Sequence, residues 1–509
     1  RDIASPWLNL VWMAVGLLAA WCIGRPFGVA PLTATAAALT FDLPVFAETQ
    51  AGSAYSDLFG VTFLLAGGAL LLNARPAASR ERPLPPAVLV VAGLAAGLAL
   101  GAKLSFAGPI VVLIAVMIAL ATRGARVRTA LLLGLPALAT GSFWYLRDFY
   151  YVHNPFPYVS HIGPIDLPGP DEGLNGGPPY SVVHYLTDGK VWSDWFLPGL
   201  RDQIGPIWFL LVGLAVLGIV LVLWQRRNPV TIAFGAATLM ALVFYLLTPE
   251  AAEGPEGMPT SFTAGLRVLE PALVMGLLLA ALAAAGLPSR ARWAGLIALA
   301  VATIVATHRS VSFWDSGGQL AGAILIGTTL ILLPAGAAVL AGRGPSGRTA
   351  AGLAVAAAVL LAVGIGWPRT ERYLDHRYRV DDAPPLYDRL SLVPVYRWAT
   401  GVRDRRIGTS GILQYGLYGN DLSNHVQFLG EVGSDHSFRE ITDCRTWRDA
   451  VNGGDYDYVV AMPRYGGKRT PQIRWTRTPA TRPVLRSGPI VVFRVLGALD
   501  PAGCAKLPA

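Results

Sequence analysis

The chain alternates long apolar stretches with short arginine-rich gaps, and this alternation constrains its fold more than any other feature. The apolar stretches approach the length of a membrane span, about 20 residues for a bilayer core of ~30 Å. Arginines cluster in alternate gaps, at Arg75/Arg80/Arg82, Arg123/Arg126/Arg128, Arg226/Arg227, Arg290/Arg292 and Arg343/Arg348. Short loops rich in positive charge stay in the cytoplasm. We therefore assign these clusters to the inner side of a membrane and the intervening gaps to the outer side.

About twelve stretches are candidate membrane spans by length and apolarity. They are residues 6–23, 29–46, 55–72, 86–100, 104–121, 129–145, 205–224, 230–247, 269–287, 293–307, 320–340 and 350–365. With Arg1 outside, all five arginine clusters fall inside and the last span leads outward. Two regions can instead be re-entrant: the stretch 29–46, which Pro31 and Pro44 interrupt, and the tight connection at 101–103.

The apolar rhythm ends near residue 367, and a polar tail of about one small domain follows. Short apolar runs at 406–411, 426–429, 457–462 and 490–496 predict strands, and 444–451 predicts a helix. Strands mixed with helices in this way are typical of a small α/β domain. We expect a polytopic α-helical membrane domain over residues 1–367, with a long outer loop at about 147–204. A C-terminal extracytoplasmic α/β domain is expected over residues 368–509.

The composition fits a multi-pass protein of the cell membrane. Hydrophobic residues make up 53% of the chain and charged residues 14%, with a mean hydropathy of +0.48. These values are too apolar for a soluble protein of this length. A net charge of +9 can indicate a nucleic-acid partner. Here much of the excess is loop arginine that sets the topology, and the sequence carries no nucleic-acid motif, so we expect no such partner.

The cysteines predict one disulfide. Cys444 and Cys504 lie in the expected outer domain, whereas Cys22 lies in a membrane span. An outer compartment is oxidising and permits disulfides, so we expect Cys444 to pair with Cys504.

Charged residues at the outer ends of the spans are the candidate functional residues. They are Glu48 and Asp57 around one short turn, Lys103 in another, Arg147 at the end of a span, and Arg267 with Glu270 at the start of one. The three cations can clamp a phosphate, arginine bidentately and lysine as a point charge. A carboxylate beside them can act as a general base or hold a divalent cation. The alternative for each residue alone is a cation that snorkels to the interface or an acid that caps a helix.

The long outer loop carries many aromatic residues, which also allow two interpretations. The first is an interfacial aromatic belt with a loop above it. The second is a short amphipathic helix over 191–197, ended by Pro198 and Gly199, on the outer surface beside a substrate cavity.

Several segments together resemble bacterial polytopic glycosyltransferases of the GT-C type. This group includes protein O-mannosyltransferases and aminoarabinose transferases, which are similar to glycosyltransferase family 39. The segments are PWLNLVW and LLAAWCIGRPFGV, AGSAYSDLFG, GLALGAKLS, GSFWYLRDFYYVHNPFP and GLRVLEPAL, with GILQYGLYGNDLSNHVQFLG and DYDYVVAMP in the tail. The resemblance implies a dozen or more membrane helices and an outer α/β domain. It also implies transfer of a sugar from a polyprenyl-phosphate-linked donor to an extracytoplasmic glycan, lipid or protein.

The resemblance also implies roles for individual residues. Asp57 matches the second acidic position of the family, and Lys103, Arg147 and Arg267 match positions that contact the donor phosphate. The acid that family members use as catalytic base usually follows the first span. We expect that segment to precede Arg1, so Asp57 and Glu48 are the catalytic candidates within the chain.

Two rival functions use the same outer charges. One is a transporter or flippase for a lipid-linked glycan, which should carry polar residues deep within its spans and often internal repeats. The spans here are nearly free of charge at mid-depth, which favours an interfacial enzyme. The other is a non-catalytic subunit that presents the outer domain.

Overall fold

The computed structural model describes residues 4–46, 56–74, 84–156, 161–162, 164–168, 180–225, 228–312, 346, 349, 391–411, 413–433, 438–463 and 470–506. The chain forms two compact units. The first comprises Arg1–Trp144 and Tyr180–Thr370, and the second comprises Tyr145–Pro179 and Glu371–Ala509. The second unit thus includes part of the segment that was expected to be an outer loop of the membrane domain, while the predicted boundary near 367 lies outside the described residues.

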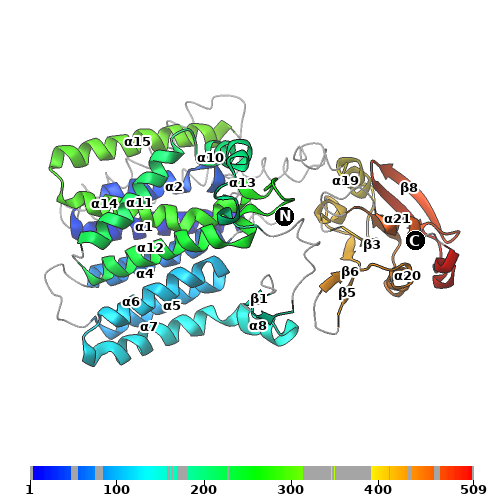
Figure 1. Cartoon of the computed structure of the whole chain (residues 1–509), viewed down its shortest axis with the longest axis horizontal. Coiled ribbons are helices and arrows are strands. Elements are labelled where there is room, and N and C mark those ends of the chain that lie inside the picture. Colours follow the sequence, from blue (N-terminus) through cyan, green and yellow to red (C-terminus); the bar gives the residue numbers. More distant parts are fainter. Residues whose placement is uncertain are drawn as a thin grey trace. The chain divides into compact units, whose positions relative to one another are not determined.

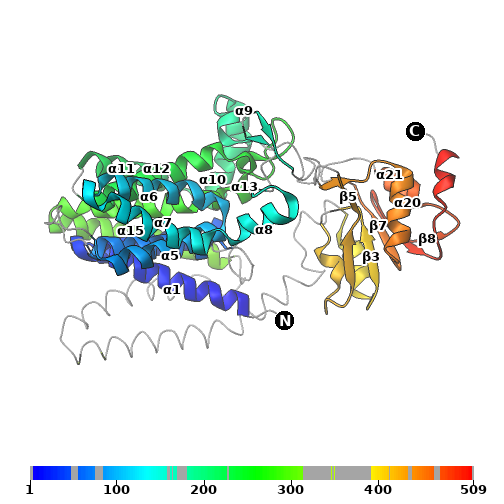
Figure 2. The ribbon, with the colours of Figure 1, turned by 90° about the horizontal axis from the view of Figure 1, so that it is seen from below.

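The first unit is a bundle of long apolar helices that lie side by side (Figures 1 and 2). Its main helices are α1 (Ala4–Gly24), α2 (Ala30–Phe41), α4 (Asp57–Ala74), α5 (Pro86–Ala102), α6 (Ala107–Leu120), α7 (Arg126–Gly141), α11 (Trp208–Gln225), α12 (Pro229–Leu247), α14 (Glu270–Ala283) and α15 (Ser289–Ser312). One large apolar core runs through them. The predicted helical membrane domain is therefore confirmed in its general form.

The number of spans is smaller within the described residues than the sequence predicts. Five helices there are long and apolar enough to cross a membrane, or six if α7 and α8 (Phe143–Val152), bent by 52°, form one span. The predicted spans 320–340 and 350–365 lie outside the described residues. The predicted span 29–46 contains the 12-residue helix α2, which is too short to cross a bilayer by itself. Its helix ends at Phe41, shortly before Pro44, because a proline disfavours helical backbone in the residue before it.

A stripe of glycines brings α5 and α7 into close contact. Gly93, Gly97 and Gly101 recur at every fourth position of α5, on one face of the helix. A Cβ atom on Gly97 would lie 2.0 Å from Thr140 Oγ1, and one on Gly93 would lie 2.4 Å from the Leu133 carbonyl oxygen. The Thr140 hydroxyl donates a 3.0 Å hydrogen bond to the Leu94 carbonyl. Small residues allow this approach of two backbones, which positions the end of α5.

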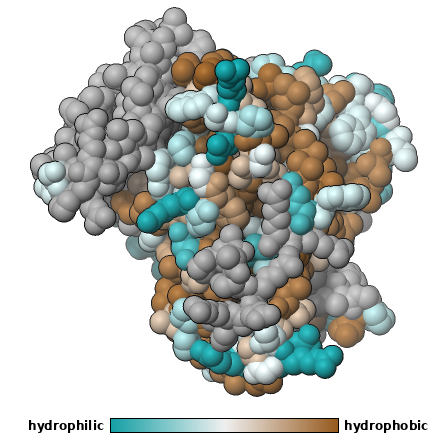
Figure 3. Space-filling view, turned by 90° about the vertical axis from the view of Figure 1, so that its left-hand side faces the viewer, coloured by the Kyte–Doolittle hydropathy of each residue, from teal (hydrophilic) through white to brown (hydrophobic). Residues whose placement is uncertain are grey.

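The arginine-rich connections that the structure describes gather at one end of the bundle. Asn73 at the end of α4 donates a 2.8 Å hydrogen bond to the Cys22 carbonyl of α1. A Cβ on Gly28, just after α1, would lie 4.0 Å from Arg292 Nη1 of α15. The α6–α7 connection, which carries Arg123, lies at this same end, on the left in Figure 1. Seen from that end, the described surface mixes hydrophilic residues with large hydrophobic areas (Figure 3).

The second unit contains a five-stranded mixed sheet of order β4-β3-β7-β9-β8. The strands are β3 (Arg406–Thr409), β4 (His425–Phe428), β7 (Tyr458–Ala461), β8 (Thr481–Ser487) and β9 (Ile490–Val495). β3 runs parallel to β4 and β7, whereas β9 is antiparallel to β7 and β8. The helices beside it are α19 (Val393–Thr400), α20 (Cys444–Gly453) and α21 (Pro471–Thr476). The four strands and the helix that the sequence predicts are all present.

Within the five-stranded sheet, the sequence analysis missed β8; it also did not predict the short strands of two small two-stranded sheets, β1 (His161–Ile162) with β2 (Ile165–Asp166) and β5 (Gly430–Val432) with β6 (Phe438–Glu440). Arg482, Pro483 and Arg486 interrupt the apolar pattern of β8, and most of its side chains are exposed. β8 lies at the edge of the sheet, where a proline is tolerated because one side of the strand needs no hydrogen-bond donors.

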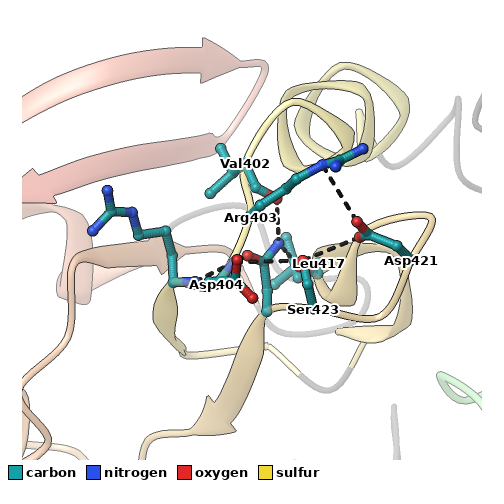
Figure 4. Close-up of polar contacts among 8 residues, drawn as sticks. Val402, Arg403, Asp404, Leu417, Asp421 and Ser423 are labelled. Atoms are coloured by element: carbon teal, nitrogen blue, oxygen red, sulfur yellow. Dashed lines mark hydrogen bonds and ion pairs between the residues drawn. The ribbon is translucent and has the colours of Figure 1, made fainter.

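Polar contacts hold the turn that leads from α19 into β3 (Figure 4). Arg403 Nε lies 3.3 Å from Asp421 Oδ2. The Ser423 hydroxyl donates to Asp421 Oδ1 at 3.1 Å and accepts a hydrogen bond from the Asp404 amide at 3.4 Å. Asp404 has a positive φ of 53°, so this turn needs such support. The contacts tie the start of β3 to the segment that precedes β4.

A disulfide joins Cys444, the first residue of α20, to Cys504 near the end of the chain. This is the pair that the sequence predicts. The buried Arg448 of α20 strengthens the same attachment by donating hydrogen bonds to the Trp475 and Asp500 carbonyls, at 2.9 and 2.7 Å. The last described residues are thereby held against α20.

Candidate active site

Asp57 occupies the first position of α4 and is buried, with 3% of its surface exposed. The preceding Ser56 donates a 2.9 Å hydrogen bond from its hydroxyl to the Ala102 carbonyl at the end of α5. One turn into α4, Gly60 leaves room for the ring of Phe106, which a Cβ would approach to 2.4 Å. These two contacts hold the start of α4 against the end of α5.

Lys103 follows α5 directly and has an extended backbone that points the chain into the short helix η2 (Leu104–Phe106). Its ammonium donates to Asp57 Oδ1 at 2.5 Å. The Asp57 side chain is 5% exposed and that of Lys103 25% exposed, so the pair is largely shielded from water. Removing one member of such a pair leaves an uncompensated charge and typically costs about 3–5 kcal/mol. The structure thus brings together two residues that the sequence places on separate turns.

Glu270 is the first residue of α14 and is completely buried. Asp57 and Lys103 are the charged groups that act on it electrostatically. Within the part of the chain that the structure describes, neither of its carboxyl oxygens has a hydrogen-bond partner. A buried carboxyl group without a donor is costly to keep in a fold, which makes Glu270 a candidate functional residue. The sequence analysis noted Glu270 at the start of a span but assigned it no role.

The other predicted site residues are Arg267, Arg147 and Glu48, and each lies in a different part of the chain. Arg267 is half-buried in η8 (Leu266–Leu269), which leads directly into Glu270 and α14. Arg147 belongs to α8 and the second unit, where its Nη1 lies 3.2 Å from Asp148 Oδ1 and its guanidinium lies 5.5 Å from the Tyr151 ring centroid. Glu48 lies outside the described residues. The roles of Arg147 and Glu48 therefore stay predictions.

Metal binding at this position also stays a prediction. Asp57 and Glu270 are oxygen ligands of the kind that Mg²⁺ and Mn²⁺ prefer. However, the Lys103 ammonium already compensates the Asp57 carboxylate. Across the described ranges, no group of three or more His, Cys, Asp or Glu side chains is arranged to hold a metal ion.

The helix expected at 191–197 differs from its prediction in length and environment. A helical segment runs from α9 (Gly189–Val191) through a π-helical turn (Trp192–Phe196) into α10 (Leu197–Gln203). Pro198 does not end it: it lies in the first turn of α10, directly after the π-helical turn. Phe196 is fully buried and stacks on Phe262 at 4.2 Å, so this side of the helix contacts protein. Phe262 begins α13 (Phe262–Gly265), just before η8.

A second polar cluster joins two loops of the first unit. His184 Nε2 lies 3.0 Å from Glu256 Oε1, and the His184 ring stacks on Tyr180 at 4.4 Å. Hydrogen bonds from the Tyr180 side chain and from His184 lower the pKa of the exposed Glu256 carboxyl group. The Tyr180 carbonyl accepts a 2.9 Å hydrogen bond from the Ala252 amide. The segment before α9 is therefore attached to the loop that follows α12.

Comparisons with known proteins give likenesses at the level of structure. No family model matches the chain, and no curated protein matches its sequence. Among solved structures, ArnT from Cupriavidus metallidurans in the apo state is 17% identical, with a TM-score of 0.48 over 96% of this chain and 82% of ArnT. The same protein bound to undecaprenyl phosphate is 14% identical, with a TM-score of 0.47 over 96% of this chain and 83% of ArnT. ArnT is an aminoarabinose transferase of the GT-C type.

Proposed function

We propose that the chain is a membrane glycosyltransferase that moves a sugar from a polyprenyl-phosphate-linked donor to an extracytoplasmic acceptor. The acceptor would be a glycan, lipid or protein of the cell envelope. The observation that carries this proposal is the buried Asp57–Lys103 pair beside Glu270, at the ends of apolar helices. Charges in such surroundings are expensive and usually serve a function.

The cluster suits a reaction in which a phosphate leaves and a hydroxyl attacks. A donor phosphate would attract the Lys103 ammonium away from Asp57, with Arg267 as a further cation of the same unit. The bond between the sugar carbon and the phosphate oxygen breaks, and a bond from that carbon to the acceptor oxygen forms. Polyprenyl phosphate leaves with the electron pair, and the hydroxyl proton passes to a carboxylate. In-line attack inverts the configuration at the sugar carbon.

The proposal includes a topology. About twelve spans would place the site and the second unit outside the cytoplasm, in accordance with the positive-inside rule. The described arginine-bearing connections support this arrangement, because they gather at one end of the bundle. The polyprenyl chain would enter laterally from the outer leaflet between helices.

The direct test is Asp57→Asn in proteoliposomes supplied with undecaprenyl-phosphate-linked mannose, glucose or arabinose and with acceptors extracted from bacterial envelopes. We expect release of undecaprenyl phosphate to fall by about 10²-fold or more, the usual contribution of a positioned acid or base. The charge-neutral double variant Asp57→Asn/Lys103→Met is the folding control, since it removes both buried charges. It should elute as a single species and remain inactive. Unchanged turnover of a folded Asp57→Asn variant would remove Asp57 from the site.

The same vesicles test the rival function. A flippase would move the lipid-linked sugar across the bilayer without forming any transfer product. If the protein does this in the presence of acceptors extracted from bacterial envelopes, the transferase proposal fails.

A further inference from the structure

One face of the sheet in the second unit carries five residues in register across all five strands. In the order of the strands they are Val426, Ile407, Tyr458, Arg494 and Arg482. Residues directly opposite one another on neighbouring strands point to the same face. Val426, Ile407 and Tyr458 belong to the apolar cluster beneath α19. The last two positions, on β9 and β8, are exposed arginines.

The two arginines form an unfavourable pair. Arg482 and Arg494 face each other directly across β8 and β9, and like charges in that relation are destabilising. Among the described residues, neither has an acidic partner. Arg403 of the same domain, in contrast, is paired with Asp421 (Figure 4). An arginine pair without an acid is complementary to a bound anion, which both guanidinium groups can contact bidentately.

Aromatic rings continue the row next to the arginine pair. Tyr458 is directly opposite Arg494 on β7, and its ring meets the Trp398 ring edge-to-face at 5.0 Å. Both rings are half-buried, so each leaves part of its surface accessible. A half-exposed aromatic ring offers a rigid apolar surface on which the C–H face of a sugar ring can pack.

We propose that Arg482 and Arg494, together with Tyr458 and Trp398, form a binding site for an anionic saccharide, a sugar that carries a phosphate or carboxylate group. The anion is assigned from the arginine pair alone. The choice of a saccharide rests on the aromatic rings and on the proposed function in glycan synthesis. The site consists of residues of the second unit, whereas the Asp57–Lys103 cluster belongs to the first.

The test is chemical protection of individual arginines in the full chain, held in nanodiscs of neutral phosphatidylcholine. Hydroxyphenylglyoxal modifies accessible guanidinium groups, and peptide mass spectrometry gives the rate at each position. Glucose 1-phosphate should slow modification of Arg482 and Arg494 several-fold. Arg486 is the matched control, because it is exposed on the same strand but pairs with Val491 on the opposite face. Its rate should not change.

A substitution gives an independent measurement. In Arg494→Gln, the concentration of glucose 1-phosphate that half-protects Arg482 should rise about tenfold, the loss expected for one charge-assisted hydrogen bond. Arg486→Gln should leave it unchanged. Both variants alter exposed side chains, so folding is preserved.

Three further probes, neutral glucose, inorganic phosphate and phosphatidylglycerol, distinguish a saccharide from a simple anion and from a lipid surface as the ligand. Neutral glucose should not protect, and inorganic phosphate should protect less well than glucose 1-phosphate. If inorganic phosphate protects as well as glucose 1-phosphate, the saccharide assignment is wrong. If only phosphatidylglycerol nanodiscs protect the two arginines, the assignment is also wrong and the ligand is a lipid surface. Protection by none of the probes overturns the site. Sugar transfer is not measured, so this result is independent of the proposed catalytic function.

Discussion

At the scale of residues, the candidate site depends on contacts between positions far apart in the chain. Lys103 and Asp57 are 46 positions apart, yet their side chains form one buried ion pair. Glu270 adds a second carboxylate from another helix. The sequence identified all three as outer charges, because they lie at the ends of apolar spans on the side opposite the arginine clusters. It assigned no role to Glu270, since only the packing of α14 buries that carboxyl group.

Replacement of Glu270 by Gln tests its role. Gln keeps the size of the side chain and removes a buried carboxyl that has no donor among the described residues. We expect thermal stability to stay the same or rise, because the desolvated charge is lost. The kcat for sugar transfer should fall by about 10²-fold if the carboxylate contacts the reacting groups.

The matched control for this change is Glu256→Gln, which alters an exposed acid in the loop after α12. Its kcat should be near that of the wild type. An unaltered kcat in a stable Glu270→Gln protein would show that Glu270 has no part in the reaction.

At the scale of elements, hydrophobicity located the helices well and their ends less well. The apolar runs predicted α1, α4, α5, α6, α11 and α12 to within a few residues. Of the two alternatives for 29–46, the 12-residue α2 is too short for a span, which leaves a re-entrant segment as the prediction. The prediction failed at the helical segment around Pro198, which continues beyond the proline. Length and packing of a helix depend on its neighbours, and a single apolar run does not contain that information.

The α5–α7 contact gives a prediction at this scale. Gly97→Ala should destabilise the protein by about 1–3 kcal/mol, because the added methyl group overlaps Thr140 Oγ1 and the Ala137 carbonyl oxygen. Gly134→Ala on α7 is the control, since a Cβ there meets nothing within 4 Å. Replacing glycine inside a helix should then leave stability unchanged or raise it by up to about 1 kcal/mol.

Thermal unfolding in detergent, followed by loss of the monodisperse chromatographic peak, measures both variants. Gly97→Ala should also lower sugar transfer, because Lys103 follows α5 directly. Equal melting temperatures for the two variants would contradict close packing of α5 against α7.

At the scale of the whole molecule, the disulfide links the fold to its compartment. The chain has three cysteines, and the structure joins two of them while Cys22 is free. Protein denatured without reductant should therefore show one reactive thiol per chain with Ellman's reagent. Three thiols would argue against an oxidising environment for the second unit and thus against its proposed outer location.

Reduction should also weaken the second unit. The bridge closes a loop with a sequence separation of 60 residues. A loop of that length constrains the unfolded chain by about 4 kcal/mol in the chain-entropy model. Urea unfolding with and without reductant, followed by circular dichroism of the full chain, measures the shift in the second transition.

The sequence by itself determined which segments are apolar helices and where four strands of the second unit lie, to within two residues. These are local properties, because the length of an apolar run and its periodicity are set by neighbouring residues. Only the tertiary structure decided that Lys103 meets Asp57, that Glu270 is buried beside them, and that Arg494 faces Arg482. Such pairs arise when helices and strands distant in sequence pack together, and close packing around residues such as Gly60 and Gly97 selects one arrangement.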